Sequence, residues 1–229
     1  MRIGRKMVPP AGTRALVLFS GGIDSAVTLW WAKAQGWEVL PLTFHYFRRP
    51  DREVRATRRL KDLAGLPALR EVELPFLKEV YDLRDEGVAN QLLLESPEGY
   101  IPARNMVFYA LAAYYAEVEG ARWVLGGHNG TDPDSFPDAS PKFFNFVNSM
   151  YRIGLWSWPK TPVQILLPLS GKSKVEVVRL GRELGVPFEH TWSCYWDGDV
   201  HCGVCESCRE RRAAFAALGV PDPIAYARP

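Results

Sequence analysis

Two short stretches of this 229-residue chain combine residue types that could do chemistry. The first, "SGGIDS", runs from Ser20 to Ser25 and joins two glycines, two hydroxyls and a carboxylate. The second holds all of the chain's cysteines: Cys194, Cys202, Cys205 and Cys208. The first stretch has the character of an anion site, and the second has the ligands that a soft metal ion prefers.

The glycine turn, residues 20–25, follows the apolar run "ALVLF" and precedes an amphipathic stretch. A strand, glycines and a helix start together aim backbone N–H groups and a helix N-terminus at an anion. Gly21 and Gly22 permit positive φ and let a phosphate approach the backbone with no Cβ in the way. Asp24 would repel a bare phosphate, so it either holds a Mg²⁺ that bridges to the phosphates or caps the helix.

The cysteines have the spacing C-x7-C-x2-C-x2-C, which suits one tetrahedral site made of four thiolates. Four thiolates complete the shell of a zinc ion without His201, and such a closed site is structural and contributes folding energy. An iron–sulfur cluster is the alternative, since C-x2-C-x2-C also occurs in cluster proteins. Cysteines gathered in one metal site favour a reducing compartment, and we expect a cytoplasmic protein.

An alternation of strands and helices positions these two stretches. The pattern predicts strands at 15–19, 38–46, 69–75, 122–128 and 164–169, and helices at 24–35, 51–64, 105–119, 142–153, 173–184 and 206–218. This order predicts an α/β fold with a mostly parallel, Rossmann-like sheet and helices on both faces. Ligands of such sheets bind beyond the carboxyl ends of the strands, where residues 20–25, 45–49, 126–138 and 170–174 fall. Residues 76–100 fit no single element.

Composition limits what else the chain can do. Apolar residues make up 47% and charged residues 24%, which is typical of a globular protein, and a net charge of +2 gives no broad basic field for nucleic acid. Six arginines between Arg48 and Arg59 are interpreted as the solvated face of a helix, with anion binding as the alternative. No apolar run reaches the roughly 18 residues of a membrane span, and residues 1–12 lack the apolar region of a secretory signal.

Both stretches, and the segments between them, resemble one known family. "SGGIDS" after an apolar strand is similar to the pyrophosphate loop of the ATP pyrophosphatase (PP-loop) superfamily. With "YIPARNMVFYALAAYYAE", "GGHNGTDPDSFPDASPKFF", "PLSGKSKVEVVRLGRELGVPFEHTWSCY" and "CGVCESCRERRAAF", it resembles the 7-cyano-7-deazaguanine synthase family of the queuosine and archaeosine pathways. The resemblance implies an adenine nucleotide alpha hydrolase-like fold and a ligase. That ligase adenylates 7-carboxy-7-deazaguanine with ATP, lets ammonium form the amide, and activates the amide again to give the nitrile.

The resemblance also implies roles for individual residues. ATP with Mg²⁺ would be bound by Leu18, Phe19, Ser20, Gly21, Gly22, Ile23, Asp24, Ser25 and Phe44. Catalysis would involve Asp24, Arg104 and Lys174, and the deazapurine would contact Asn105, Asn129, Asp132, Phe136 and Asp138. Asp138 is expected to accept from the N1–H and exocyclic amine of the guanine edge. Zn²⁺ would be held by the four cysteines, and the protein would be a homodimer that contacts neither membrane nor nucleic acid.

Several alternatives stay open at this stage. Arg104 could pair with an acid at the surface, and Asn105 could be only an N-cap. The chain departs from the family pattern at "HYFRRPDRE", where His45 replaces an acid, and at "PDSFPDAS", which includes Ser135. A tRNA-sulfurating enzyme, a paralogue that adenylates another carboxylate, and a non-catalytic zinc-stabilised nucleotide-binding module remain rival functions. We expect a flexible arm at 1–13, an ATP-binding domain at 14–190, and a zinc-binding segment with a C-terminal helix at 191–229.

Overall fold

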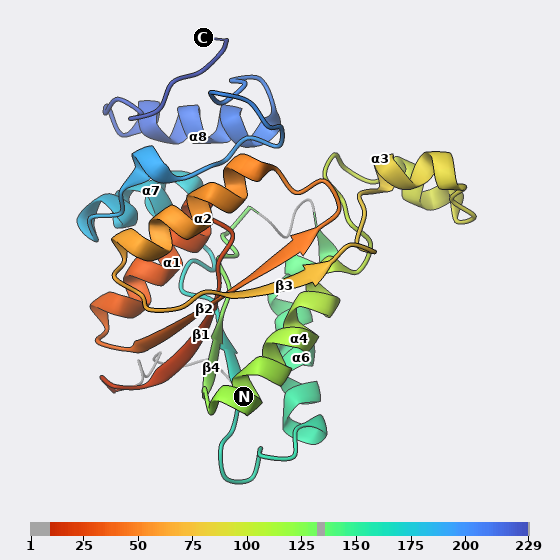
Figure 1. Ribbon diagram of the computed structural model, residues 1–229, viewed down its shortest axis with the longest axis vertical. Helices are drawn as coiled ribbons and strands as arrows, with labels where there is room; N and C mark the ends of the chain where they lie inside the picture. Colours follow the sequence, from red (N-terminus) through yellow and green to blue (C-terminus); the bar gives the residue numbers. More distant parts are fainter. Residues whose placement is uncertain (1–9, 132–135, 229) are drawn as a thin grey trace.

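The computed structural model describes residues 10–131 and 136–228, and these form one parallel β-sheet flanked by helices (Figure 1). The strands stand in the order β3-β2-β1-β4-β5 and every neighbouring pair is parallel. Their bounds are β1 Arg14–Leu18, β2 Glu38–Tyr46, β3 Arg70–Leu74, β4 Trp123–Leu125 and β5 Gln164–Leu166. The strand order reverses between β1 and β4, so a ligand crevice is expected beyond the carboxyl ends of these two strands.

Helices cover both faces of this sheet, as the sequence predicts (Figure 1). One side carries α1 Ile23–Ala34, α2 Asp51–Leu63, α7 Lys174–Glu183 and, beyond α7, α8 Glu206–Ala217. The other side carries α4 Arg104–Glu119 and α6 Pro141–Gly154. Shorter pieces are α3 Val80–Leu83, η1 Arg84–Glu86, η2 Gln91–Glu95, η3 Pro137–Ala139 and η4 Phe188–His190. Among the described helices, none combines the length and the apolar character needed to cross a bilayer.

The central strand β1 is buried on both faces, which explains its continuous apolar run. Ala15 and Val17 pack into a core with α1, α7 and α8. Leu16 faces the opposite core, which α4 and α6 cover. Alternation along the strand therefore distributes one apolar run between two hydrophobic layers.

Two predicted strands extend too far at their carboxyl ends. β4 stops at Leu125 and β5 at Leu166, whereas the apolar pattern predicts strand to 128 and 169. The Gly126 amide still donates to the Leu166 carbonyl at 3.3 Å, and the chain after Leu125 lies close to other backbone and side chains. A Cβ on Gly126 would lie 1.8 Å from the Tyr109 hydroxyl, and one on Gly127 would lie 3.0 Å from the Ser25 amide nitrogen. These glycines let the β4 loop lie against the first turn of α1.

Candidate active site and metal centre

The glycine turn is closed by its own hydroxyl groups. The amides of Ser20 and Gly21 each donate to the Ser25 Oγ at 3.2 Å, and this hydroxyl donates to the Gly22 carbonyl at 3.1 Å. Helix α1 begins directly after Gly22, which is its N-cap and makes no side-chain capping bond. The first amides of a helix have no intrahelical carbonyl to bind, so the start of α1 is a suitable place for an anion.

The two glycines of the turn differ in conformation, and only Gly21 uses the positive φ that glycine permits. Gly21 has φ +90°, and a Cβ there would lie 2.7 Å from both the amide and the hydroxyl of Thr57 on α2. Gly22 has φ −77°, a conformation that any residue adopts. Gly21 is thus required for packing against α2, whereas a Cβ at Gly22 would make only ordinary contacts, 3.5 Å from Ser20 Oγ and from the Trp192 carbonyl oxygen.

Asp24 belongs to a charged group formed by three distant segments. Its carboxylate accepts from Lys174 Nζ at 2.7 Å and from Asn129 Nδ2 at 3.3 Å. The interpretation of Asp24 as the helix cap is wrong, because Gly22 occupies the N-cap position. The carboxylate is therefore available, with oxygens of the kind that Mg²⁺ prefers, beside a cation that can neutralise phosphate charge.

Arg49 is the exception to the interpretation of the arginine-rich stretch as a solvated face, because Arg48, Arg55, Arg58 and Arg59 are exposed as expected. Its side chain is only 2% exposed and joins the ends of β1 and β2 to α2. The guanidinium donates to the Ser20 carbonyl at 2.8 Å and the Phe44 carbonyl at 2.8 Å, and Nε pairs with Glu53 at 3.0 Å. It also donates to the hydroxyls of two buried threonines, Thr43 and Thr57. Arg49 therefore holds the glycine turn in place from behind.

A cavity of about 390 Å³ opens at the carboxyl ends of the strands. It is lined by most of the residues predicted to bind ATP or substrate or to take part in catalysis: Leu18, Phe19, Ser20, Gly22, Ile23, Asp24, Ser25, Phe44, Arg104, Asn105, Phe136 and Lys174. Gly21, Asn129 and Asp138 are not among its lining residues, and Asp132 lies outside the described residues. The fold thus brings residues from the whole length of the chain to one place.

Aromatic rings and acids line the part of the cavity away from the glycine turn. Phe44 stacks on Phe108 with ring centroids 4.2 Å apart, and the Arg104 guanidinium lies 5.7 Å from the Phe136 ring. Glu79 and Glu98 also line the cavity, and burial raises the pKa of the Glu79 carboxyl above its ordinary value, although the Arg104 charge opposes this. The cavity therefore has an anion-binding end and an end that is flat, apolar and acidic.

Asn105 and Asp138 bond to each other at the start of α4. The Asn105 amide donates to Asp138 Oδ2 at 3.1 Å, and its side chain donates to the Asp138 carbonyl at 3.1 Å. The alternative that Asn105 is an N-cap is wrong, because Ala103 occupies that position. Arg104 forms no ion pair within the described part of the chain, which also argues against its interpretation as a surface partner.

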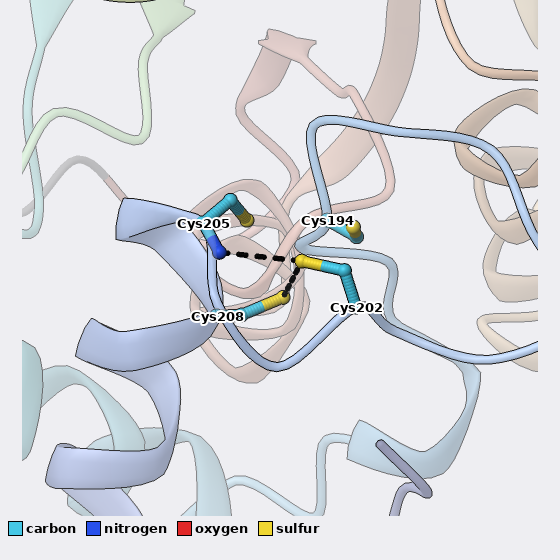
Figure 2. Close-up of side chains that lie close together, drawn as sticks. All are labelled: Cys194, Cys202, Cys205 and Cys208. Carbon is cyan, nitrogen blue, oxygen red and sulfur yellow. Dashed lines mark hydrogen bonds between the residues drawn. The ribbon is translucent and has the colours of Figure 1, made fainter. Parts of the chain in front are cut away.

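The four cysteines meet at one point, as their spacing predicts (Figure 2). Their sulfurs all lie within 4.8 Å of one another, and the sulfurs of Cys202 and Cys208 are 3.8 Å apart. Sulfurs about 2.3 Å from one tetrahedral ion are themselves separated by about 3.8 Å, so the donor set fits such an ion. The His201 ring stands outside this set, because its Nε2 accepts from the Ser193 amide at 3.0 Å.

Backbone amides favour the thiolate form of one cysteine, Cys202. Cys202 Sγ accepts from the amides of Val204 at 3.3 Å and Cys205 at 3.2 Å. Burial opposes ionisation of this thiol, but these amides stabilise its charged form and lower its pKa to about 7. Burial raises the pKa of the Cys194 and Cys208 thiols, so a bound cation would be needed to hold all four as thiolates.

Helix α8 and the chain after it are fastened by a buried ion pair. Arg211 Nε lies 2.9 Å from Asp222 Oδ2, and the guanidinium also donates to the Thr191 hydroxyl at 2.6 Å and the Phe188 carbonyl at 3.0 Å. The Tyr226 hydroxyl donates to the same Asp222 carboxylate at 2.6 Å. The cysteine segment and the chain on both sides of it therefore form one connected structure.

The sequence profile of the family described as "Queuosine biosynthesis protein QueC" matches residues 14–219. The chain belongs to the QueC family. The matched residues include the glycine turn, the cavity residues and all four cysteines.

Curated relatives support this membership over nearly the whole chain. A "7-cyano-7-deazaguanine synthase" of Thermosynechococcus vestitus is 39% identical, with 93% of this chain and 96% of that protein covered. The protein of that name from Nostoc sp. is 37% identical, with 93% and 97% covered. Among solved structures, the "U34-tRNA thiolase NcsA from Methanococcus maripaludis with its [4Fe-4S] cluster" has a TM-score of 0.53 at 15% identity, covering 95% of this chain and 68% of that one. That last likeness shows the fold alone.

His45, where this QueC family member departs from the family's sequence pattern, does not line the cavity. His45 Nε2 lies 2.6 Å from Glu71 Oε2 on the neighbouring strand, and Glu71 also bonds Arg58 of α2 at 2.9 Å. This ion cluster is on the surface of the sheet's edge, whereas the neighbouring Phe44 and Tyr46 line the cavity. The second departure, at Ser135, lies outside the described residues.

Sequence reasoning missed several residues that build this QueC family site. Arg49 was counted with the helix arginines, yet it precedes Pro50, the N-cap of α2, and so lies outside the helix. Glu79 also lines the cavity and belongs to no recognisable motif, whereas Trp192 lies in a stretch that resembles the family but was given no role. The Trp192 amide donates to the Gly21 carbonyl at 3.0 Å, so the segment before the first cysteine holds the glycine turn directly.

Proposed function

We propose that this chain is a carbon–nitrogen ligase that converts 7-carboxy-7-deazaguanine and ammonium to 7-cyano-7-deazaguanine at the expense of two ATP. The observation that carries this proposal is the cavity itself. An anion-binding turn, a paired Asp24 and Lys174, and flat aromatic walls line one space in a QueC family chain. Relatives 34–39% identical carry the name of this activity.

The proposed reaction balances in four steps. A carboxylate oxygen of the acid attacks the α-phosphorus of ATP, and pyrophosphate leaves. Ammonia then displaces AMP, which takes that oxygen with it, and leaves the amide. The amide oxygen attacks a second ATP and pyrophosphate leaves again. Loss of AMP with the second oxygen, and of the nitrogen-bound protons, gives the nitrile.

The residues of the glycine turn suit the departure of pyrophosphate. The start of α1 and the Ser20 hydroxyl offer donors to its oxygens, and Lys174 adds a positive charge. Asp24 has the oxygen ligands that Mg²⁺ prefers, and a bound Mg²⁺ would supply charge neutralisation for the phosphates. Arg104, facing the cavity, would orient the acid or its adenylate.

The four cysteines would hold Zn²⁺. The role of the ion would be structural: it would cross-link the segment at 191–229. Four soft sulfurs with a short Cys202–Cys208 distance support a single ion. An iron–sulfur cluster is the competing occupant of the same donor set. Elemental analysis of purified protein should give about one zinc per chain. A brown protein containing several irons per chain would refute the assignment.

We also propose that the protein is a cytoplasmic homodimer that associates through α4 and α6. These helices pack on each other, with the Tyr151 hydroxyl bonded to the Tyr109 carbonyl at 2.5 Å. Their outer surfaces expose large apolar residues: Met106, Tyr114, Val118, Phe146, Met150, Ile153 and, just beyond α6, Trp156. An exposed apolar patch of this kind marks an interaction surface, and two-fold pairing of identical patches is the commonest way to cover one. Sedimentation should give a dimer that Ile153→Lys converts to a monomer.

The decisive test of the ligase is the product of the candidate acid. Incubation with 7-carboxy-7-deazaguanine, ammonium and ATP should release AMP and pyrophosphate, with the nitrile detected by mass spectrometry. Asp24→Asn should abolish release, whereas Asp51→Asn, an exposed acid of α2, should not. A protein that binds ATP without turnover of this acid would refute the proposal. Tight, salt-dependent tRNA binding would favour the tRNA-sulfurating alternative.

A further inference from the structure

The acidic end of the cavity contains a carboxylate with no hydrogen bond or ion pair among the described residues. Glu79 precedes α3, lines the cavity and is half-buried. Its backbone carbonyl accepts from the amides of Asp82 and Leu83, but its side chain makes no such contact within the described part of the chain. A partly buried carboxylate with unused oxygens needs donors from elsewhere, and a ligand in this cavity can supply them.

The other acids in or near the cavity are less suited to a ligand. Glu53 is held by Arg49 at 3.0 Å behind the glycine turn, so its charge is already compensated. Glu98 lines the cavity but is exposed to solvent, where water competes for every hydrogen bond. Asp138 bonds the Asn105 amide and lies outside the cavity lining. Glu79 is the cavity acid that is half-buried and makes no hydrogen bond among the described residues, although the Arg104 charge lowers its pKa against the effect of burial.

The two ends of the cavity impose an orientation on whatever binds. Phosphates belong at the glycine turn, beside Lys174, and would be repelled by the Glu79 and Glu98 charges. A purine-like acid must present its own carboxylate to the turn for the same reason. Its opposite edge then meets the acidic end, between the aromatic walls of Phe44, Phe108 and Phe136.

We infer that the Glu79 carboxylate binds the N1–H and the exocyclic amine of a guanine-type (2-amino-6-oxo) edge and so determines which acid the enzyme accepts. A guanine-type edge presents two parallel N–H donors, which match the two oxygens of a carboxylate. The adenine-type edge presents one donor and one acceptor, and the hypoxanthine-type edge lacks the exocyclic donor. Glu79 therefore selects for the amine and against both other edges. This inference rests on the proposed function.

The test compares two acids as substrates of the native enzyme and of the Glu79→Gln variant. The acids are 7-carboxy-7-deazaguanine and its analogue without the 2-amino group, 7-carboxy-7-deazahypoxanthine. In the native enzyme the analogue should lose at least about 100-fold in kcat/KM, since a site built to bind an N–H rejects ligands that lack it. Glu79→Gln should lower kcat/KM for the guanine acid at least about 10-fold, mainly by raising KM. The same variant should change kcat/KM for the analogue only slightly.

Controls separate this inference from the proposed function and from folding. The KM for ATP should be unchanged in Glu79→Gln, and Glu98→Gln, which alters the exposed cavity acid, should keep the native discrimination. Equal losses for both acids in Glu79→Gln, or loss of discrimination in Glu98→Gln instead, would overturn the role of Glu79. Failure of the native enzyme to turn over the guanine acid would instead refute the proposed function.

Discussion

Replacement of Arg49 by methionine should destabilise the protein far more than an exposed arginine would. Arg49→Met keeps much of the volume but removes the charge that compensates Glu53, whose side chain is 16% exposed. It also leaves the Ser20 and Phe44 carbonyls without this donor. Breaking a buried ion pair on one side costs about 3–5 kcal/mol, because the remaining charge stays buried and unpaired. For a chain of this size, that corresponds to a fall in Tm of about 6–20 °C.

The loss of stability in Arg49→Met should depend on pH. Burial raises the pKa of Glu53 in the folded protein, and the Arg49 interactions that oppose this vanish in the variant. A carboxyl with a raised folded-state pKa destabilises the fold when ionised, and the penalty disappears below its ordinary pKa. The difference between variant and native protein should therefore be largest at neutral to alkaline pH and shrink as pH falls toward the ordinary pKa of Glu53.

Urea unfolding followed by tryptophan fluorescence measures this difference. Arg55→Met is the matched control, since Arg55 is an exposed residue of α2, and it should change stability by less than about 0.5 kcal/mol. The double variant Arg49→Met with Glu53→Gln should regain a substantial part of the loss, because no buried charge remains. An Arg49→Met protein within about 1 kcal/mol of native, or a double variant no more stable than the single one, would refute this account of the glycine turn.

Three further changes test other parts of the structure. Gly21→Ala should lower the free energy of unfolding by more than about 2 kcal/mol and abolish ATP binding in calorimetry, because its Cβ would lie 2.7 Å from the α2 backbone. The control Gly65→Ala is also at positive φ but has open space around it, so it should cost only about 1 kcal/mol and leave ATP binding intact. Cys208→Ser should lose the metal by elemental analysis and lower Tm sharply, whereas exposed Arg209→Gln should do neither. His45→Gln should change kcat/KM for the acid by less than about 3-fold, since this ring bonds at the surface of the sheet; a 10-fold loss would place it in the site.

The fold was predictable because its elements have unambiguous local signals. β2 and α7 lie within one residue of their predicted bounds, since the apolar pattern and the flanking turn residues agree at both ends. The capping box of α7, in which Ser173 and Glu176 bond reciprocally, is a signal of this kind. The carboxyl ends of β4 and β5 were overextended, because the apolar residues Leu167, Pro168 and Leu169 continue after β5 ends, while two glycines follow β4.

The residues of the candidate site were predictable only where they belong to a sequence motif. The glycine turn, Lys174 and the cysteines belong to motifs, and the structure brings each motif's residues together. The buried role of Arg49 depends on carbonyls at the ends of two strands, which meet it only in the folded protein. Glu79 lies in the stretch at 76–100 that fits no single element, so its position in the cavity could not be read from spacing.

The cysteine segment contributes side chains to the candidate active site as well as to the metal centre. Trp192, Cys194 and Tyr195 line the cavity, and the Trp192 amide donates to the carbonyl of Gly21. Gly21 is fixed on its other side by α2, so the glycine turn is held between α2 and the segment that leads into the first cysteine. A metal ion that orders this segment would also order the glycine turn, because the Trp192 amide bonds Gly21 directly. Removing the metal should therefore weaken ATP binding at temperatures where the rest of the fold persists.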